Sequence, residues 1–134
     1  IDLFKRINDA HGHNVGDLVL KEIARASLDS VREIDVVARF GGEEFVVLLP
    51  HTSRQEAVEV AERLRCSIAQ GSVKLDNGVR VRFTASLGVV TLGNAREANK
   101  ELPSIDKLLK SADAAMYTAK RQGRNRVFVV ADDL

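Results

Sequence analysis

The segment Arg39-Phe40-Gly41-Gly42-Glu43-Glu44-Phe45 lies between two short hydrophobic runs and decides the fold. The runs Val36–Phe40 and Glu44–Leu49 have the length and the β-branched content that are typical of strands. Two adjacent glycines permit positive φ angles, which a two-residue hairpin turn prefers. The segment therefore predicts an antiparallel hairpin that exposes the carboxylates of Glu43 and Glu44 at its tip.

These two carboxylates are candidates for metal and proton chemistry. A carboxylate is a hard ligand for Mg²⁺, which usually also takes oxygens from substrate phosphates. A second carboxylate can accept a proton from an attacking hydroxyl, and glycine lets the backbone approach a nucleotide without a Cβ clash. A solvated acidic turn has the same short sequence, so the hairpin alone does not establish a site.

Helices and strands alternate on both sides of the hairpin. The elements expected before it are a helix capped by Asp2 that runs to Asp9 or Ala10, a break at Gly12 and Gly16, and a helix from Asp17 to about Val31. The elements expected after it are a helix from Ser53 to about Ala69, a hairpin of Ser72–Leu75 and Val79–Thr84, a strand over Ala85–Leu92, a helix from Ser104 to Gly123 and a strand over Arg126–Val130. This order predicts an α+β fold with helices packed on a central, mostly antiparallel sheet.

Composition limits the class of protein. The 134 residues suit one domain with a sizeable core, and 20 basic against 19 acidic residues argue against a polybasic nucleic-acid binder. No apolar run approaches the ~20 residues that cross a bilayer, and from the opening residues Ile1-Asp2-Leu3-Phe4-Lys5 we expect no signal peptide. The chain opens without an initiator Met, which we interpret as a piece of a longer protein. We expect a cytoplasmic domain, whether or not the full-length protein is anchored in a membrane.

Several motifs flank the hairpin in a fixed order. They are Phe4-Lys5-Arg6-Ile7-Asn8-Asp9, Gly12-His13, Gly16-Asp17, Ser86-Leu87-Gly88-Val89, Asp113, Tyr117, Ala119-Lys120 and Gly123-Arg124-Asn125-Arg126. This ordered set resembles the GGDEF family of diguanylate cyclases, here with G-G-E-E-F at the hairpin. The resemblance covers almost all of residues 1–134. It implies a fold similar to the palm of nucleotidyl cyclases and polymerases, without the family's first strand.

The resemblance implies an enzyme that condenses two GTP molecules into cyclic di-GMP and releases two pyrophosphates. In the family, the 3′-hydroxyl of one GTP attacks the α-phosphorus of the other, and each subunit of a homodimer holds one GTP. A divalent metal, Mg²⁺ or Mn²⁺, stabilises the developing charge. The resemblance also implies an upstream sensory or receiver domain, and it implies no nucleic-acid partner.

The same resemblance implies roles for individual residues. Glu44 is the implied general base and Glu43 the implied metal ligand, although adjacent carboxylates can exchange such roles, and Ile1 supplies a backbone carbonyl to the metal. The family's other metal-binding Asp would precede Ile1, so we expect the 134-residue chain alone to be a poor cyclase. The residues implied to bind GTP are Lys5 at the phosphates, Asn8 and Asp17 at the guanine edge, His13, and Lys120 and Arg124 at the triphosphate.

Three of these substrate-binding residues also have structural explanations. His13 is about as well explained by bracing the loop between Gly12 and Gly16. Lys120 and Arg124 lie near the end of a predicted helix, where a cation suits the helix dipole.

A second set, Arg32-Glu33-Ile34-Asp35, lies shortly before the hairpin. It matches the R-x-x-D site at which the family's product, cyclic di-GMP, inhibits the enzyme. Arginine can grip a phosphate or a guanine edge with two hydrogen bonds. Arg63 matches a secondary contact for the same ligand. An ordinary surface charge pair and a helix-surface arginine are the alternatives.

Other functions compete with the cyclase. A non-catalytic receptor would bind cyclic di-GMP through Arg32 and Asp35, but degenerate members usually lose the hairpin carboxylates that are present here. A class III nucleotidyl cyclase has a similar palm-like fold, but the G-G-E-E-F hairpin argues against it. A purely structural dimerisation module fits the motifs least.

Overall fold

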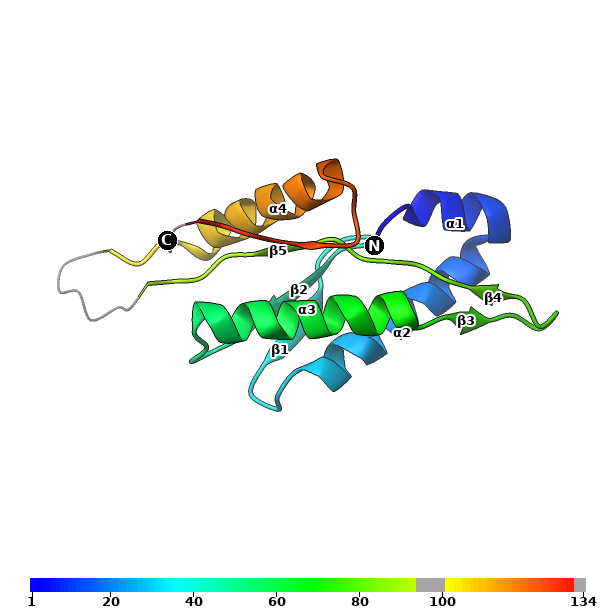
Figure 1. Cartoon of the computed structure of the whole chain (residues 1–134), viewed down its shortest axis with the longest axis horizontal. Coiled ribbons are helices and arrows are strands. Elements are labelled where there is room, and N and C mark those ends of the chain that lie inside the picture. Colours follow the sequence, from blue (N-terminus) through cyan, green and yellow to red (C-terminus); the bar gives the residue numbers. More distant parts are fainter. Residues whose placement is uncertain (94–100, 132–134) are drawn as a thin grey trace.

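The computed structural model describes residues 1–93 and 101–131. The elements in chain order are α1 (Phe4–His11), α2 (His13–Ser30), β1 (Val36–Arg39), β2 (Phe45–Leu48), α3 (Arg54–Gln70), β3 (Val73–Lys74), β4 (Arg80–Val81), β5 (Leu87–Val89), α4 (Ile105–Arg121) and β6 (Val127–Val129). Helices interleave with short strands, which confirms the predicted α+β class (Figure 1).

The strands form three separate pairs. β1 pairs with β2 and β3 with β4, both antiparallel, while β5 pairs with β6 in parallel. The pairing is therefore mostly antiparallel, as predicted, although the described strands do not join into one continuous sheet. α4 and α3 contact the β5–β6 pair from opposite sides (Figure 1).

The hydrophobic core lies where α2, α3 and the strands after α3 meet. Its buried residues are Ile1, Val19, Leu20, Ile23, Ala26, Leu64, Ile68, Val73, Phe83 and Ala85. The members on α2 and α3 recur at helical spacing, so each helix turns one apolar stripe inward. Ile1 belongs to this core, so the first residue is held in place by packing.

Two glycines permit close approaches between elements. A Cβ at Gly16 would overlap the side-chain amide of Asn8, and one at Gly88 would overlap the α4 backbone at Ala112 and Met116. Glycine therefore lets α1 pack against α2 and lets α4 lie directly on β5. The predicted helix break at Gly16 is wrong, because Gly16 lies inside α2.

Two further local predictions are wrong. Asp2 does not cap α1, because the N-cap is Leu3, with φ 55°, and no side chain caps the helix. The β1–β2 connection is a loop over residues 40–44 rather than a two-residue turn, and neither Gly41 nor Gly42 has a positive φ. The loop closes instead through backbone N–H groups of residues 40 and 41, which donate to the carbonyl of residue 44 at 2.8 and 3.3 Å.

The predicted caps of α3 and α4 and the second predicted hairpin turn are confirmed. Ser53 and Glu56 form the predicted capping box at the start of α3, and Ser104 caps α4. Asn77-Gly78 turns the β3–β4 hairpin, with Gly78 at φ 83°. None of the helices in the described ranges has both the length and the hydropathy that crossing a membrane requires.

Candidate nucleotide-binding site

A cleft of about 460 Å³ opens between α1, the first half of α2 and the β1–β2 loop. Its lining residues are Phe4, Lys5, Asn8, Asp9, His13, Asp17, Leu20, Arg39, Gly42 and Glu43. The structure thus brings together the predicted residues of the first two helices and one hairpin carboxylate. A second cavity of about 340 Å³, between the start of α2 and the β3–β4 hairpin, contains none of the predicted site residues.

Asn8 lines this cleft, and its side-chain oxygen packs against Gly16. Its side-chain oxygen is buried and accepts no hydrogen bond from the described residues. A buried acceptor without a donor costs about 1–3 kcal/mol. Asp17, exposed on α2, adds a carboxylate to the same cleft. The cleft thus brings together one side-chain amide and one carboxylate.

The start of α1 offers groups that suit an anion. No side chain caps this helix, so its first backbone N–H groups have no side-chain acceptor. Lys5 is exposed in the first turn and lines the cleft. Free amides beside a lysine are well suited to phosphate. His13, also exposed, lies across the cleft at the start of α2.

The hairpin loop is held by a residue to which sequence reasoning gave no role. Arg39 donates from Nε to the Gly41 carbonyl at 3.2 Å and from Nη2 to the Gly42 carbonyl at 2.7 Å. A long cation at the end of a strand, two residues before a pair of glycines, was the available signal. Because Arg39 also lines the cleft, its charge lies on the same side as Glu43.

The two hairpin carboxylates lie in different surroundings. Glu43 is half-buried and lines the cleft, whereas Glu44 is exposed. The Glu44 carboxylate folds back over Gly41, where a Cβ would lie 3.2 Å from its Oε2. The pair therefore offers one carboxylate that faces the cleft and one at its rim.

The end of α4 approaches the hairpin through Ile1. The Ile1 backbone nitrogen donates to the Glu43 carbonyl at 3.3 Å. The charges of Lys120, Glu43 and Glu44 all act at the Ile1 nitrogen, so the end of α4 and the hairpin both lie near it. The charge of Lys120 therefore lies close to the Ile1 nitrogen, although neither Lys120 nor Arg124 lines the cleft.

The residues present fit a divalent cation that arrives with a nucleotide. Within the described ranges, no three His, Cys, Asp or Glu side chains group to hold a metal ion. Mg²⁺ commonly uses only one or two protein carboxylates and completes its shell with water and substrate phosphate oxygens. The Glu43 carboxylate and the Ile1 carbonyl are the groups that would hold it.

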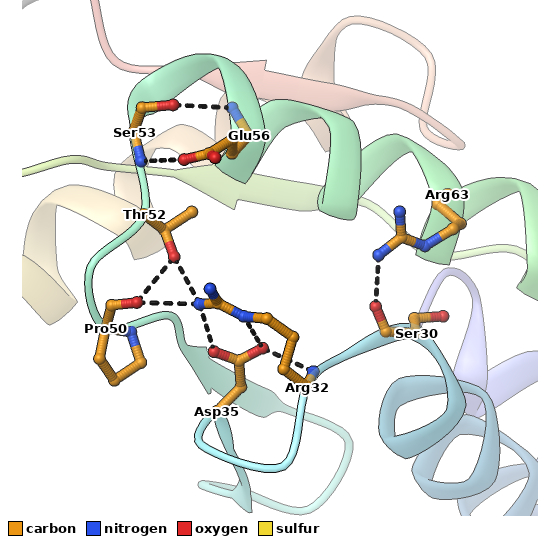
Figure 2. A network of polar contacts seen from close by, with 8 residues as sticks. All are labelled: Ser30, Arg32, Asp35, Pro50, Thr52, Ser53, Glu56 and Arg63. Carbon is orange, nitrogen blue, oxygen red and sulfur yellow. Dashed lines mark hydrogen bonds and ion pairs between the residues drawn. The ribbon is translucent and has the colours of Figure 1, made fainter.

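The second predicted set forms a hydrogen-bonded network at the α2–β1 connection (Figure 2). Arg32 donates from Nε and Nη2 to the Asp35 carboxylate at 3.2 and 2.8 Å. The same Nη2 contacts the Pro50 carbonyl and the Thr52 hydroxyl, each at 2.8 Å. The hydrogen bonds from Arg32 lower the pKa of Asp35. Arg32 and Asp35 thus satisfy one another, as expected of a charge pair, while the Arg32 side chain stays 53% exposed.

Arg63 lies on α3 near the same connection. Its Nη2 donates to the Ser30 carbonyl at 2.7 Å, two residues before Arg32 (Figure 2). The two arginines therefore contact one short segment of the chain, although no hydrogen bond links their side chains to a common partner.

Comparison with known proteins agrees with this arrangement. The family model described as "Diguanylate cyclase, GGDEF domain" matches residues 1–126. Diguanylate cyclase A of Treponema denticola is 42% identical over 134 residues, which are the whole of this chain and 34% of that protein. The chain thus spans about a third of the length of this curated relative.

Solved structures give the same result. The diguanylate cyclase SiaD of Pseudomonas aeruginosa, solved with its activator SiaC, superposes with a TM-score of 0.85 at 40% identity, over 96% of this chain and 46% of SiaD. The GGDEF domain of DgcB from Caulobacter crescentus, in complex with c-di-GMP, gives 0.83 at 30% identity, over 96% of this chain and 72% of that one. With a matching family model over nearly its whole length, the chain belongs to the GGDEF-domain family of diguanylate cyclases.

Proposed function

We propose that this chain is the catalytic domain of a diguanylate cyclase, which converts two GTP molecules into cyclic di-GMP and two pyrophosphates. The observation that carries the proposal is the single cleft that collects Lys5, Asn8, Asp17 and Glu43. A base-binding pair, a phosphate-binding helix start and a metal-binding carboxylate are the parts that nucleotidyl transfer from GTP requires. The names of the relatives support the same activity.

The amide of Asn8 and the carboxylate of Asp17, which line the same cleft, support guanine as the base. Guanine presents an N1–H and an exocyclic amine on one edge, and both donate hydrogen bonds. The Asn8 oxygen and the Asp17 carboxylate can accept them. Adenine has no N–H at N1, so it would leave one of these acceptors unpaired. The cleft should therefore prefer GTP to ATP.

We assign the chemical step to residues at and near the rim of the cleft. Glu44 accepts the proton of the attacking 3′-hydroxyl, and Lys5, Lys120 and Arg124 hold the triphosphate and the departing pyrophosphate. A bound Mg²⁺ or Mn²⁺ would neutralise charge on the phosphates. Catalysis on this scheme is mainly positioning and electrostatic stabilisation.

Cyclisation requires two copies of the domain. One cleft of this size holds one nucleotide, yet the product contains two guanosine units joined by two phosphodiester bonds. Two domains that face each other, each with its own GTP, provide both attacking hydroxyls and both leaving groups. We assign control of this encounter to an upstream sensory or receiver domain.

We further propose that cyclic di-GMP inhibits the enzyme by binding Arg32, Asp35 and Arg63. Support comes from the half-exposed Arg32 side chain, whose Nη1 has no hydrogen bond among the described residues. The planar end of Arg32 is already oriented by Asp35, Pro50 and Thr52, so less freedom is lost when a phosphate or guanine binds. The DgcB domain solved with c-di-GMP is a relative that binds this ligand.

The test is to incubate the full-length protein with GTP and Mg²⁺ and to identify the product by mass spectrometry. The proposal predicts cyclic di-GMP and pyrophosphate in a ratio of one to two, with no product from ATP. Tight cyclic di-GMP binding without any GTP turnover would instead support a non-catalytic receptor. A cyclic mononucleotide product would support a class III cyclase.

A further inference from the structure

The turn that follows α4 has an unusual backbone. Three successive residues have positive φ angles, 124° at Gly123, 63° at Arg124 and 45° at Asn125. Glycine adopts such angles readily, but two consecutive non-glycine residues do so rarely, because the Cβ crowds the backbone. Local hydrogen bonds hold part of this turn, from the Arg124 N–H to the Ala119 carbonyl and from Arg126 Nε to the Arg124 carbonyl, each at 3.1 Å, and contacts from elsewhere in the molecule add to them.

Two side chains from distant parts of the chain form hydrogen bonds with Asn125. Its backbone N–H donates to Oδ2 of Asp2 at 3.0 Å. Its side-chain oxygen accepts from Nη1 of Arg65, on α3, also at 3.0 Å. The last residue of the turn is thus held from both sides, by the first residues of the chain and by α3.

Asp2 is also fixed at the start of the β5 segment. Its carboxylate accepts hydrogen bonds from the Thr84 hydroxyl at 2.7 Å and the Ser86 hydroxyl at 2.5 Å. Its backbone N–H donates to the Thr84 carbonyl at 2.9 Å. The residue is only 4% exposed, and such a buried carboxylate is tolerated because donors surround it. Burial alone would raise the pKa of Asp2, but the hydrogen bonds from Ser86, Thr84 and Asn125 outweigh burial and lower it.

Asp2 lies between two parts of the candidate site, the β1–β2 hairpin and the end of α4. Ile1, the neighbour of Asp2, contacts the hairpin at Glu43. Arg124 directly precedes Asn125. Lys120 lies in the last turn of α4, four residues before Arg124. One buried carboxylate therefore connects the hairpin end of the site to the turn that carries Arg124 and directly follows the last turn of α4, where Lys120 lies.

We propose that Asp2 is a positioning residue that holds the Arg124-Asn125 turn in place and thereby directs Lys120 and Arg124 to the phosphates of the bound nucleotide. Asp2 itself contacts no substrate. The inference rests on the proposed function, because it takes GTP as the ligand. It accounts for Asp2 being buried where helix capping would have left it at the surface.

The first experiment compares GTP with guanosine. Guanosine has the base but no phosphates, so a loosened turn should weaken only GTP binding. Asp2→Ala should lower GTP affinity about tenfold and leave guanosine affinity within about twofold, as measured by calorimetry. Asp2→Asn should retain most GTP affinity, because an amide oxygen can still accept from Asn125 while hydroxyls of Thr84 and Ser86 rotate to suit the amide.

A double-mutant cycle tests whether Asp2 acts through the turn. Arg124→Ala should weaken GTP binding in the wild-type background. In the Asp2→Ala background the same change should add less than about twofold, since coupled residues are not additive. Arg65→Ala, which removes the other grip on Asn125, should lower GTP affinity in the same direction and provides the test if Asp2→Ala does not fold.

Ile68→Val is the matched control, because it destabilises the core without touching the turn. It should leave the ratio of GTP to guanosine affinity unchanged. Equal losses of GTP and guanosine binding in Asp2→Ala, or strict additivity with Arg124→Ala, would overturn the inference while leaving the proposed function intact. Failure of the wild-type protein to bind GTP would overturn both.

Discussion

At the scale of single residues, the hairpin carboxylates illustrate how neighbours in sequence acquire different chemistry. Glu43 is half-buried, and its carbonyl is held by the Ile1 nitrogen. Glu44 is exposed and lies over Gly41. A metal ligand benefits from a fixed position, and a base needs access to the incoming hydroxyl. The division of roles between Glu43 and Glu44 stays a prediction, which the next variant tests.

Glu44→Gln should abolish formation of cyclic di-GMP by the full-length protein while GTP affinity changes by less than about threefold. Glutamine keeps the shape of the side chain but cannot accept the hydroxyl proton, and general-base assistance is worth about 10²–10⁴-fold in rate. Product formation and GTP binding are measured separately. Glu59→Gln, an exposed change on α3, serves as the control. Near-normal turnover in Glu44→Gln would show that another group is the base.

Asn8→Ala and Asp17→Ala should each reduce the preference for GTP over ATP. Both side chains line the cleft, and each is expected to accept a guanine N–H. Loss of one such contact corresponds to about 1–3 kcal/mol. Competition binding with the two nucleotides gives the preference directly. If GTP and ATP affinities fell by the same factor, the residues would be acting on phosphates or on folding.

Some residues of the site were predictable from sequence and others were not. Asn8 and Asp17 could be placed together because a known family carries them in the same order. Asp2 was misassigned because a residue before a helix usually caps it, and its partners Thr84, Ser86 and Asn125 are remote in sequence. Such contacts depend on how the elements pack, and no local pattern reports them.

At the scale of secondary-structure elements, the α2–β1 connection forms a small rigid unit. The Arg32 backbone N–H donates to the Asp35 carboxylate at 2.7 Å, and the Asp35 N–H donates to the Arg32 carbonyl at 3.0 Å. The first turn of α3 is fixed beside it by the Ser53–Glu56 capping box (Figure 2). A ligand at Arg32 would therefore contact a surface whose shape is already set.

Arg32→Ala should leave turnover intact and relieve inhibition by cyclic di-GMP. The change removes a charged contact, for which we expect about a ten- to hundredfold loss of inhibitor affinity. The measurement is the initial rate against added cyclic di-GMP. Arg25→Ala is the control, since Arg25 is an exposed arginine of α2 whose ion pairs, within the described ranges, are with Glu22 and Asp29. Unchanged inhibition in Arg32→Ala would place the inhibitory site elsewhere.

Elements with local signals were predicted well. Capping residues and the Asn77-Gly78 turn act within a few residues, so their effect can be seen in the sequence. The wider β1–β2 loop was missed because its shape depends on Arg39, which reaches back to two glycine carbonyls. The strand predicted over residues 85–92 is shorter in the structure. Of these residues, 87–89 pair with β6 and form β5.

At the scale of the whole molecule, the proposed reaction depends on an encounter between two copies. Specific activity at saturating GTP should rise with protein concentration below the dimer dissociation constant and level off above it. Rates measured over a hundredfold dilution, with the oligomeric state followed by light scattering, check this. Specific activity that stayed constant while the protein was monomeric would contradict the two-domain mechanism.

The hydrogen bond between Asp2 and Asn125 spans 123 positions of the chain. Contacts so distant in sequence form late in folding, because the entropy of closing a long loop must be offset first. While the protein is being made on the ribosome, the helices α1 and α2 can form long before the turn after α4 has emerged. We therefore expect a nascent chain to acquire its base-binding surface first and its phosphate-binding residues only after the turn that follows α4 has emerged.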